Sequence, residues 1–173
     1  MSEGRGSVQE LVVGIGSDDL GFALKQEIVA MLKAEPGVME VRDFGVPSAE
    51  DLTPYPIIAL AAAERVAAGE VGRVILICGT GLGMAISANK VPSVRAAVAY
   101  DQYSVERSVL SNDCQVLCMG ARVVTPELAR RIVHDWLAYR FDPSSPSARK
   151  IGMISQYEQR TSVRGLHEEV SSR

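Results

Sequence analysis

Short apolar runs alternate with longer amphipathic segments along most of the chain. Runs that are rich in β-branched residues and end in glycine or a polar residue are typical of buried strands, and they cover residues 11–16, 39–44, 74–77, 95–100 and 116–119. Apolar positions at helical spacing predict helices between and after these runs, near residues 22–32, 57–68, 84–90, 104–111, 126–139 and 148–159. This alternation predicts an α/β fold in which helices cover both faces of a parallel sheet.

The run at residues 74–77 predicts the central strand and ends in the most informative stretch of the chain. Cys78 stands at the carboxyl end of that strand. A glycine-rich turn then leads into the next helix, through Gly79, Thr80, Gly81, Leu82 and Gly83. Glycines let the backbone turn sharply, and bare N–H groups at a helix N-terminus bind anions. A thiol, a hydroxyl and several amides are therefore predicted to meet at one site.

Charged residues also follow other predicted strands. Asp18 and Asp19 follow the first strand, Asp101 the fourth and Arg122 the fifth. Ligands of parallel α/β sheets bind beyond the carboxyl ends of the strands. We therefore expect these side chains to converge with Cys78 at one edge of the sheet.

Each of these residues also has a purely structural interpretation. Cys78 could be a small apolar filler, but the glycine-rich turn that follows it favours a reactive thiolate. Cys118 lies inside an apolar run and is expected in the core, whereas Cys114 is expected to be a surface or loop thiol. Asp18 and Asp19 could simply cap the following helix.

The glycine pattern leaves a dinucleotide-binding interpretation open. Met84 stands where a G-x-G-x-x-G fingerprint requires its third glycine, which weakens that interpretation, but Asp101 lies about twenty residues further on, as the fingerprint requires. The chain has two histidines, His134 and His167, and neither follows a predicted strand. Acid–base chemistry is therefore assigned to Cys, Asp, Ser, Thr or Tyr side chains.

Composition limits the classes of function. The 173 residues, of which 47% are hydrophobic, predict one domain at 11–159, after a flexible leader at 1–10 and before a polar tail at 160–173. A net charge of -3 without a basic stripe argues against nucleic-acid binding. Three cysteines without framework spacing indicate a reducing compartment. With neither a signal peptide nor a membrane-spanning run, a cytoplasmic protein without membrane contact is expected.

Four motifs together resemble the family of ribose-5-phosphate isomerase B and galactose-6-phosphate isomerase. They are C-G-T-G-x-G at 78–83, S-A-N-K at 87–90, S-N-D at 111–113 and M-G-A-R-V-V at 119–124. The resemblance extends from about residue 11 to 157 and implies a Rossmann-like three-layer α/β/α sandwich with a five-stranded parallel sheet. It also implies an aldose–ketose isomerase that acts on a sugar phosphate through a cis-enediol, with no metal or organic cofactor. The family works as a homodimer or dimer of dimers with sites at the interface.

The resemblance assigns roles to individual residues. Cys78 matches the base that moves a proton between C1 and C2 of the open-chain sugar, and Thr80 with the turn amides matches the anion hole for the enediolate oxygen. The residues that it implies for substrate binding are Asp18, Asp19, Tyr55, Gly79, Gly81, Gly83, Asn89, Ser111, Asn112, Arg122, Arg149 and Lys150.

The chain departs from the family pattern where histidines are usual. Asp19 and Ser111 stand in two such positions, and the C-terminal phosphate clamp is reduced to Arg149 and Lys150. A tetrose 4-phosphate cannot close a furanose ring because its O4 is blocked, so its isomerase needs no ring-opening group. The pattern at 101–112 also resembles the branch linked to D-erythrulose 4-phosphate and erythritol breakdown. We therefore expect the substrate pair to be D-erythrulose and D-erythrose 4-phosphate, in preference to ribose and ribulose 5-phosphate, which belong to the pentose phosphate route. A non-catalytic sugar-phosphate-binding paralogue remains the alternative.

Overall fold

The computed structural model describes residues 11–171, and side chains as far as residue 161. The predicted leader lies outside the described residues. In chain order the elements are β1 (Leu11–Ser17), α1 (Phe22–Ala34), β2 (Val38–Asp43), α2 (Tyr55–Ala67), β3 (Arg73–Cys78), α3 (Leu82–Ala88), β4 (Ala96–Val98), α4 (Gln102–Leu110), β5 (Val116–Gly120), α5 (Pro126–Ala138) and α6 (Ser147–Ser171).

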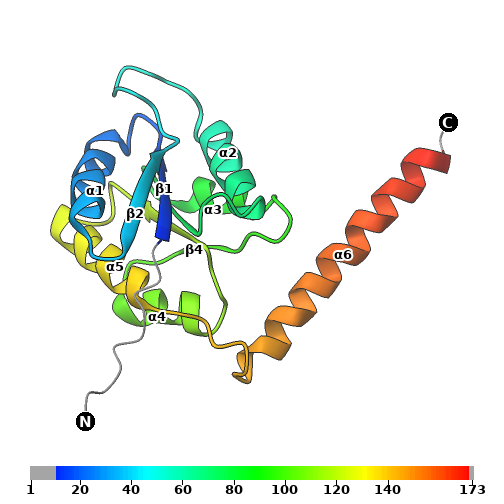
Figure 1. The fold of residues 1–173 in the computed structure, drawn as a ribbon. Helices are drawn as coiled ribbons and strands as arrows, with labels where there is room; N and C mark the ends of the chain where they lie inside the picture. Colours follow the sequence, from blue (N-terminus) through cyan, green and yellow to red (C-terminus); the bar gives the residue numbers. More distant parts are fainter. Residues whose placement is uncertain (1–10, 172–173) are drawn as a thin grey trace, which may run out of the picture.

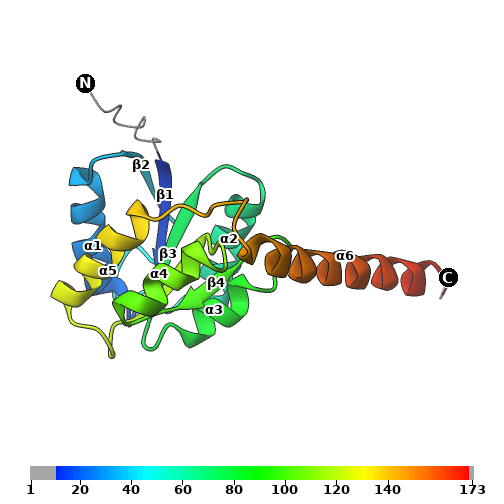
Figure 2. The same ribbon diagram turned by 90° about the horizontal axis from the view of Figure 1, so that it is seen from below.

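The strands form one parallel sheet of five in the order β2-β1-β3-β5-β4. Helices α1, α4 and α5 pack on one face, and α2 and α3 pack on the other (Figures 1 and 2). The predicted three-layer α/β/α sandwich is confirmed. Because β2 lies on one side of β1 and β3 on the other, the chain changes direction there, which opens a crevice at the carboxyl ends of these strands.

The central strand β3 is buried along its whole length. It pairs with β1 on one side and β5 on the other, so that Ile77 lies beside Ser17 and Met119. A strand between two neighbours and two helical layers has no face left for water, which explains its continuous apolar sequence. Its last residue, Cys78, is thereby held at the edge of the sheet where β1 and β5 also end.

Several element boundaries differ by one or more residues from the sequence-based expectation, and three of the differences have a clear local cause. Helix α2 begins at Tyr55 because Pro54 supplies the extended N-cap and Pro56 fits the first turn. Strand β4 spans only Ala96–Val98, since it is an edge strand that pairs with β5 alone. Helix α6 continues through the expected tail to Ser171, because no proline interrupts the polar stretch after the apolar pattern fades.

A buried lysine fixes the segment after β2. Lys25 on α1 is 1% exposed, and its Nζ donates to the Asp43 carboxylate at 2.7 and 3.0 Å and to the Val46 carbonyl at 2.8 Å. The Val46 amide in turn donates to the carbonyl of Ser17 at 2.9 Å. The start of this loop is therefore tied to the end of β1, and the loop leads to Tyr55.

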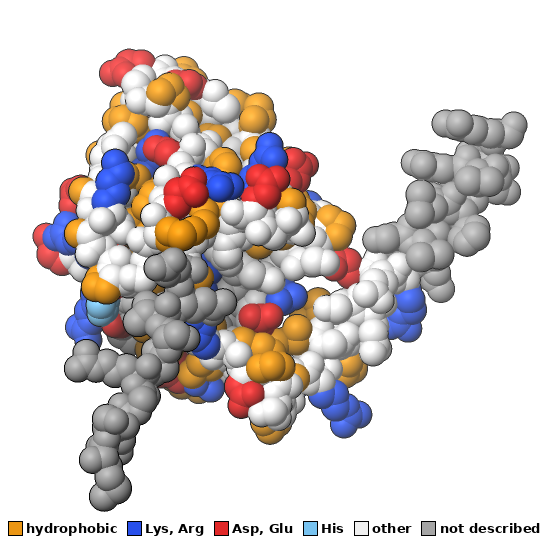
Figure 3. All heavy atoms as spheres, viewed as in Figure 1, with side chains coloured by type: hydrophobic (Ala, Val, Ile, Leu, Met, Phe, Trp, Pro, Cys, Tyr) orange, Lys and Arg blue, Asp and Glu red, His pale blue; other side chains and the backbone are white. Residues whose placement is uncertain are grey.

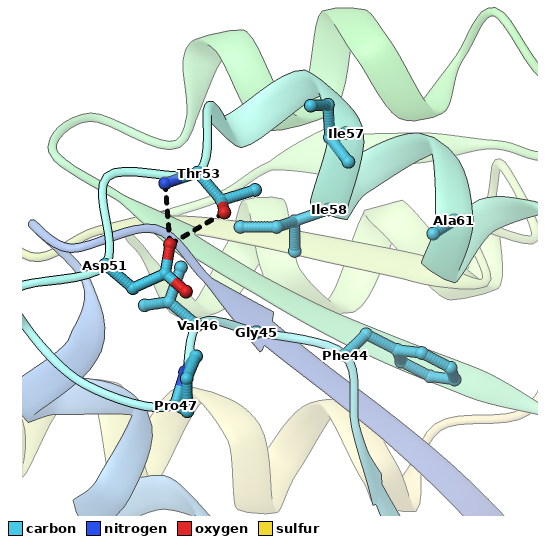
Figure 4. A pocket seen from close by; sticks show the side chains of 9 residues that line it. All are labelled: Phe44, Gly45, Val46, Pro47, Asp51, Thr53, Ile57, Ile58 and Ala61. Atoms are coloured by element: carbon cyan, nitrogen blue, oxygen red, sulfur yellow. Dashed lines mark hydrogen bonds between the residues drawn. The ribbon is translucent and has the colours of Figure 1, made fainter.

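The same loop lines a small pocket of about 160 Å³ against α2 (Figure 4). Most of its wall is apolar, and its one carboxylate, Asp51, accepts hydrogen bonds from the amide and hydroxyl of Thr53 at 2.9 and 2.7 Å. The expected loop at 47–56 is confirmed as far as Pro54.

Across the part of the chain that the structure describes, no helix combines the length and apolarity needed to cross a membrane.

Candidate active site

A pocket of about 270 Å³ opens where β1, β3 and β5 end. The residues that line it are Asp18, Leu20, Tyr55, Cys78, Gly79, Thr80, Gly83 and Arg122. All but Leu20 were expected from the sequence. Leu20 was missed because a leucine carries no chemical signal, although its place directly after the two aspartates at the end of β1 could have indicated it.

Cys78 forms part of the wall between this pocket and the core. Its side chain is only 5% exposed and packs with the apolar cluster under α2 and α3, yet it lines the pocket. The amide of Gly81 donates a hydrogen bond to its Sγ at 3.1 Å. An N–H donated to sulfur stabilises the thiolate form, and the apolar wall keeps the sulfur fixed in one place.

The other two cysteines do not line the pocket and are unsuited to act as thiolates. Cys118 is fully buried, and burial raises its pKa well above the ordinary value. Cys114 is 7% exposed, and burial raises its pKa to about 11. The expectation of a core Cys118 is confirmed. Cys114 lies in the loop before β5, as one of its two expected settings has it, but it is buried and is not a surface thiol. The segment before β5 folds over the end of the core near Arg73 and Arg95, which encloses Cys114.

Two glycines of the turn are required by its close contacts. Gly81 has φ +78°, and a Cβ there would lie 2.9 Å from the backbone of Met119. A Cβ on Gly83 would lie 2.5 Å from the Tyr55 ring. The phenol of Tyr55 can therefore cover the first turn of α3 only because position 83 has no side chain, and this places the phenol on the pocket wall.

Asp18 both holds the turn before α1 and lines the pocket. Its Oδ1 accepts from the amide of Gly21 at 3.1 Å, and its side chain lines the pocket while only 6% exposed. Burial raises the pKa of Asp18; the Gly21 hydrogen bond opposes this effect, and the neighbouring charge of Asp19 adds to it. Asp19 itself is not among the lining residues, and its carbonyl accepts from the Phe22 amide as α1 begins.

Arg122 reaches the pocket because the turn after β5 is bonded to the turn after β3. The amides of Ala121 and Arg122 donate to the carbonyls of Cys78 and Gly79 at 2.8 and 3.1 Å. The exposed side chain of Arg122 then runs past Gly79. Among the described residues it has no ion-pair partner, so its positive charge is available to an anionic ligand.

Two other expected residues hold the scaffold together. Asn89 donates to the Ala96 carbonyl at 2.8 Å and accepts from the Ala96 amide at 2.9 Å, which joins the end of α3 to β4. Asp101 accepts from the Ser104 amide at 2.8 Å as the N-cap of α4. Neither lines the pocket.

The remaining expected residues lie away from the pocket of their own chain. Ser111 and Asn112 bond to Arg107 at the carboxyl end of α4. Since α4 runs back toward the start of β5, these residues lie at the opposite edge of the sheet from Cys78. Arg149 and Lys150 are exposed on α6, which projects from the body of the molecule (Figures 1 and 3).

Comparison with known proteins decides the family. The family model described as Ribose/Galactose Isomerase matches residues 13–154. The chain belongs to this family. The resemblance carried by the motifs is therefore confirmed, and the chain is an isomerase of the ribose/galactose type.

Named relatives match over nearly their whole length. D-erythrulose-4-phosphate isomerase 2 of Mycolicibacterium smegmatis is 55% identical over 148 residues, which cover 86% of this chain and 97% of the relative. Ribose-5-phosphate isomerase B of Escherichia coli is 46% identical with the same coverage. The structure of ribose-5-phosphate isomerase B from Clostridium thermocellum superposes with a TM-score of 0.82 at 44% identity, covering 87% of this chain and 99% of the other.

Proposed function

We propose that this chain interconverts the aldose and ketose forms of a short sugar phosphate, with D-erythrose 4-phosphate and D-erythrulose 4-phosphate as its preferred pair. The observation that carries the proposal is the composition of the pocket. It brings together a thiol, a carboxylate, a phenol and an arginine, and no histidine is among the described residues that line it. The name of the Mycolicibacterium smegmatis relative supports the same substrate pair.

The pocket residues have distinct roles in the proposed reaction. The Cys78 thiolate takes the proton from C2 of the aldose while the electron pair moves toward the C1 carbonyl, which gives a cis-enediolate. The hydroxyl of Thr80 and the amides of the turn other than that of Gly81, which donates to Cys78, stabilise the oxygen on which charge develops. The two oxygens of the cis-enediolate lie side by side, so the proton of the C2 hydroxyl passes to O1. Cys78 then returns its proton to C1, C2 becomes a carbonyl and the ketose forms. Asp18 and Tyr55 bind the sugar hydroxyls, and Arg122 is placed to meet the anionic end.

The missing histidines suit a substrate that is already linear. His134 pairs with Glu35 at 2.8 Å between α5 and α1 and is not a pocket residue, and the side chain of His167 lies outside those described. A pentose 5-phosphate must first be opened from its furanose form, which needs an acid and a base. A tetrose 4-phosphate needs no such step.

We therefore expect a higher kcat/KM for the tetrose pair than for the pentose pair. We expect the two values of kcat/KM to differ by about tenfold or more, since a positioned acid or base contributes at least that much to a step such as ring opening. The measurement is a coupled assay of the purified protein with D-erythrulose 4-phosphate and with ribulose 5-phosphate under the same conditions. Faster turnover of the pentose would contradict the assignment.

We also propose that two copies of the chain combine to complete each site. Ser111, Asn112, Arg149 and Lys150, which the family resemblance assigns to substrate, are remote from the pocket of their own chain. Helix α3, whose first turn lines the pocket, exposes Leu82 and Ile86 on one face at 56% and 63%. Further exposed apolar residues lie on α6, namely Met153, Ile154 and Tyr157. Such faces suit a homodimer, or a dimer of dimers, in which a second copy supplies the basic residues.

Complementation between inactive variants tests the shared site. Cys78→Ala removes the base from one site, and Lys150→Ala removes a cation that is expected to act in the neighbouring site. Subunits that are mixed, denatured together and refolded should recover about a quarter of wild-type activity, because half of the dimers are mixed and each has one intact site. Each variant refolded alone is the control. Failure of the mixture to exceed both controls would contradict a shared site.

A further inference from the structure

The peptide group between Thr80 and Gly81 is held from both sides. Its carbonyl accepts a hydrogen bond from the hydroxyl of Tyr100. Its N–H donates to the Sγ of Cys78 at 3.1 Å. Because a trans peptide is planar, with its C=O and N–H pointing in opposite directions, the hydroxyl that fixes the carbonyl also aims the N–H at the sulfur.

Tyr100 can reach this peptide because of the strand order of the sheet. It follows the edge strand β4, beyond β5, and its ring packs against the core under α4 and α5. Between Tyr100 and β3 lies the end of β5, where a Cβ on Gly120 would come within 2.6 Å of the Thr80 backbone. The absence of a side chain at position 120 lets the turn settle over β5, where its carbonyl meets the phenol.

The phenol is suited to remain a donor. Burial raises the pKa of Tyr100, and the neighbouring Cys78 and Cys118 add to the effect. The phenol oxygen of Tyr100 therefore stays protonated at neutral pH, and its O–H remains directed at the Thr80 carbonyl. The other bonds of the turn, such as that from the Arg122 amide to the Gly79 carbonyl at 3.1 Å, hold neighbouring peptides instead.

We propose that Tyr100 is a positioning residue for the isomerisation: its hydroxyl orients the Thr80–Gly81 peptide so that the Gly81 amide holds the Cys78 sulfur as a thiolate at the pocket wall. The inference rests on the proposed role of Cys78 as the base. Tyr100 itself is not among the residues that line the pocket, so it acts through the peptide and not on the substrate.

Tyr100→Phe tests the proposal because it removes only the hydroxyl. We expect kcat to fall about three- to tenfold, the usual effect of one lost hydrogen bond, while KM stays within about twofold because no substrate contact is lost. The matched control is Tyr103→Phe, three residues further on, because Tyr103 is 73% exposed. The control should keep both kinetic constants and the wild-type thermal midpoint.

The reactivity of Cys78 gives a second readout that needs no substrate. Alkylation by iodoacetamide, located by mass spectrometry, is followed against pH. Cys114 and Cys118 react slowly because neither lines the pocket and burial raises the pKa of both. The half-maximal pH should move upward in Tyr100→Phe, since the thiolate loses a well-aimed donor. The other ionisable groups that face Cys78 are Asp18, Tyr55, Cys118 and Arg122, and they are unchanged in the variant.

The outcomes separate the two proposals. An unchanged kcat, an unchanged alkylation midpoint or a downward shift of that midpoint would overturn the role of Tyr100, and so would a fall in kcat that merely follows a fall in the thermal midpoint. Wild-type protein without isomerase activity would overturn the proposed function, while the alkylation experiment would still decide whether the hydroxyl of Tyr100 controls the sulfur.

Discussion

Replacing Cys78 by alanine should lower kcat about 10³-fold and leave substrate binding in place. The thiol is the group that we propose to carry the proton between C1 and C2, and a positioned base contributes about 10²–10⁴-fold to such a step. Binding should survive because Asp18, Tyr55 and Arg122 line the pocket independently of the sulfur. The coupled assay gives kcat, and titration calorimetry with D-erythrulose 4-phosphate gives the affinity.

Cys118→Ala is the matched control for this variant. Cys118 lies on β5, beside Leu76 of β3, in the same apolar cluster as Cys78, but it is fully buried and does not line the pocket. Its loss should therefore leave kcat within about twofold of wild type, because the substrate does not meet it. If Cys78→Ala kept more than about a tenth of wild-type kcat, the proton-transfer role would have to be assigned elsewhere.

Asp43→Ala should destabilise the fold by about 3 kcal/mol, because it leaves the ammonium of Lys25 buried without its counter-charge. Lys25 is 1% exposed and would keep the Val46 carbonyl and the face of the Phe22 ring, neither of which carries a negative charge. For a chain of this size the thermal midpoint should fall by about 6–12 °C. The loop that leads to Tyr55 would also lose one of its two ties to Lys25 of α1, so KM should rise.

Glu40→Ala, on the same strand, provides the comparison. Glu40 pairs with Arg42 at 2.8 Å, but both side chains are exposed, and exposed pairs contribute little. Its thermal midpoint should match that of the wild type. Equal shifts in the two variants would mean that the charge of Lys25 is not stabilised by Asp43. Thermal denaturation followed by circular dichroism provides the comparison.

Most of the fold could be predicted because each strand is a distinct apolar run and each intervening helix has its own periodicity. The exceptions have local causes. The extent of α6 was underestimated because a polar helix has no apolar repeat to follow. The burial of Cys114 was missed because its environment depends on how the segment before β5 folds over the core, which no neighbouring residue indicates.

The candidate site was predictable to the extent that its residues directly follow strands. Asp18, Cys78 and Arg122 meet because parallel strands end at one edge of the sheet. Tyr55 could be predicted as a site residue only from the family resemblance. It stands at the start of α2 and does not follow a strand, and it reaches the pocket because of the path of the loop after β2. The contact of Tyr100 with the turn after β3 depends on β4 lying beyond β5. Hydrophobic periodicity predicts strands but not their order in the sheet, so this contact could not be predicted from the sequence.

The most direct test of the account is deuterium exchange, followed by NMR, when D-erythrulose 4-phosphate is incubated with the enzyme in D₂O. If the Cys78 sulfur exchanges its proton with solvent and passes it between C1 and C2, wild-type protein should place deuterium at C1 of the ketose and C2 of the aldose. Cys78→Ala should place none above the uncatalysed background. Exchange by the alanine variant at the wild-type rate would contradict proton transfer by Cys78. Binding of the sugar by wild-type protein without any exchange would contradict it equally.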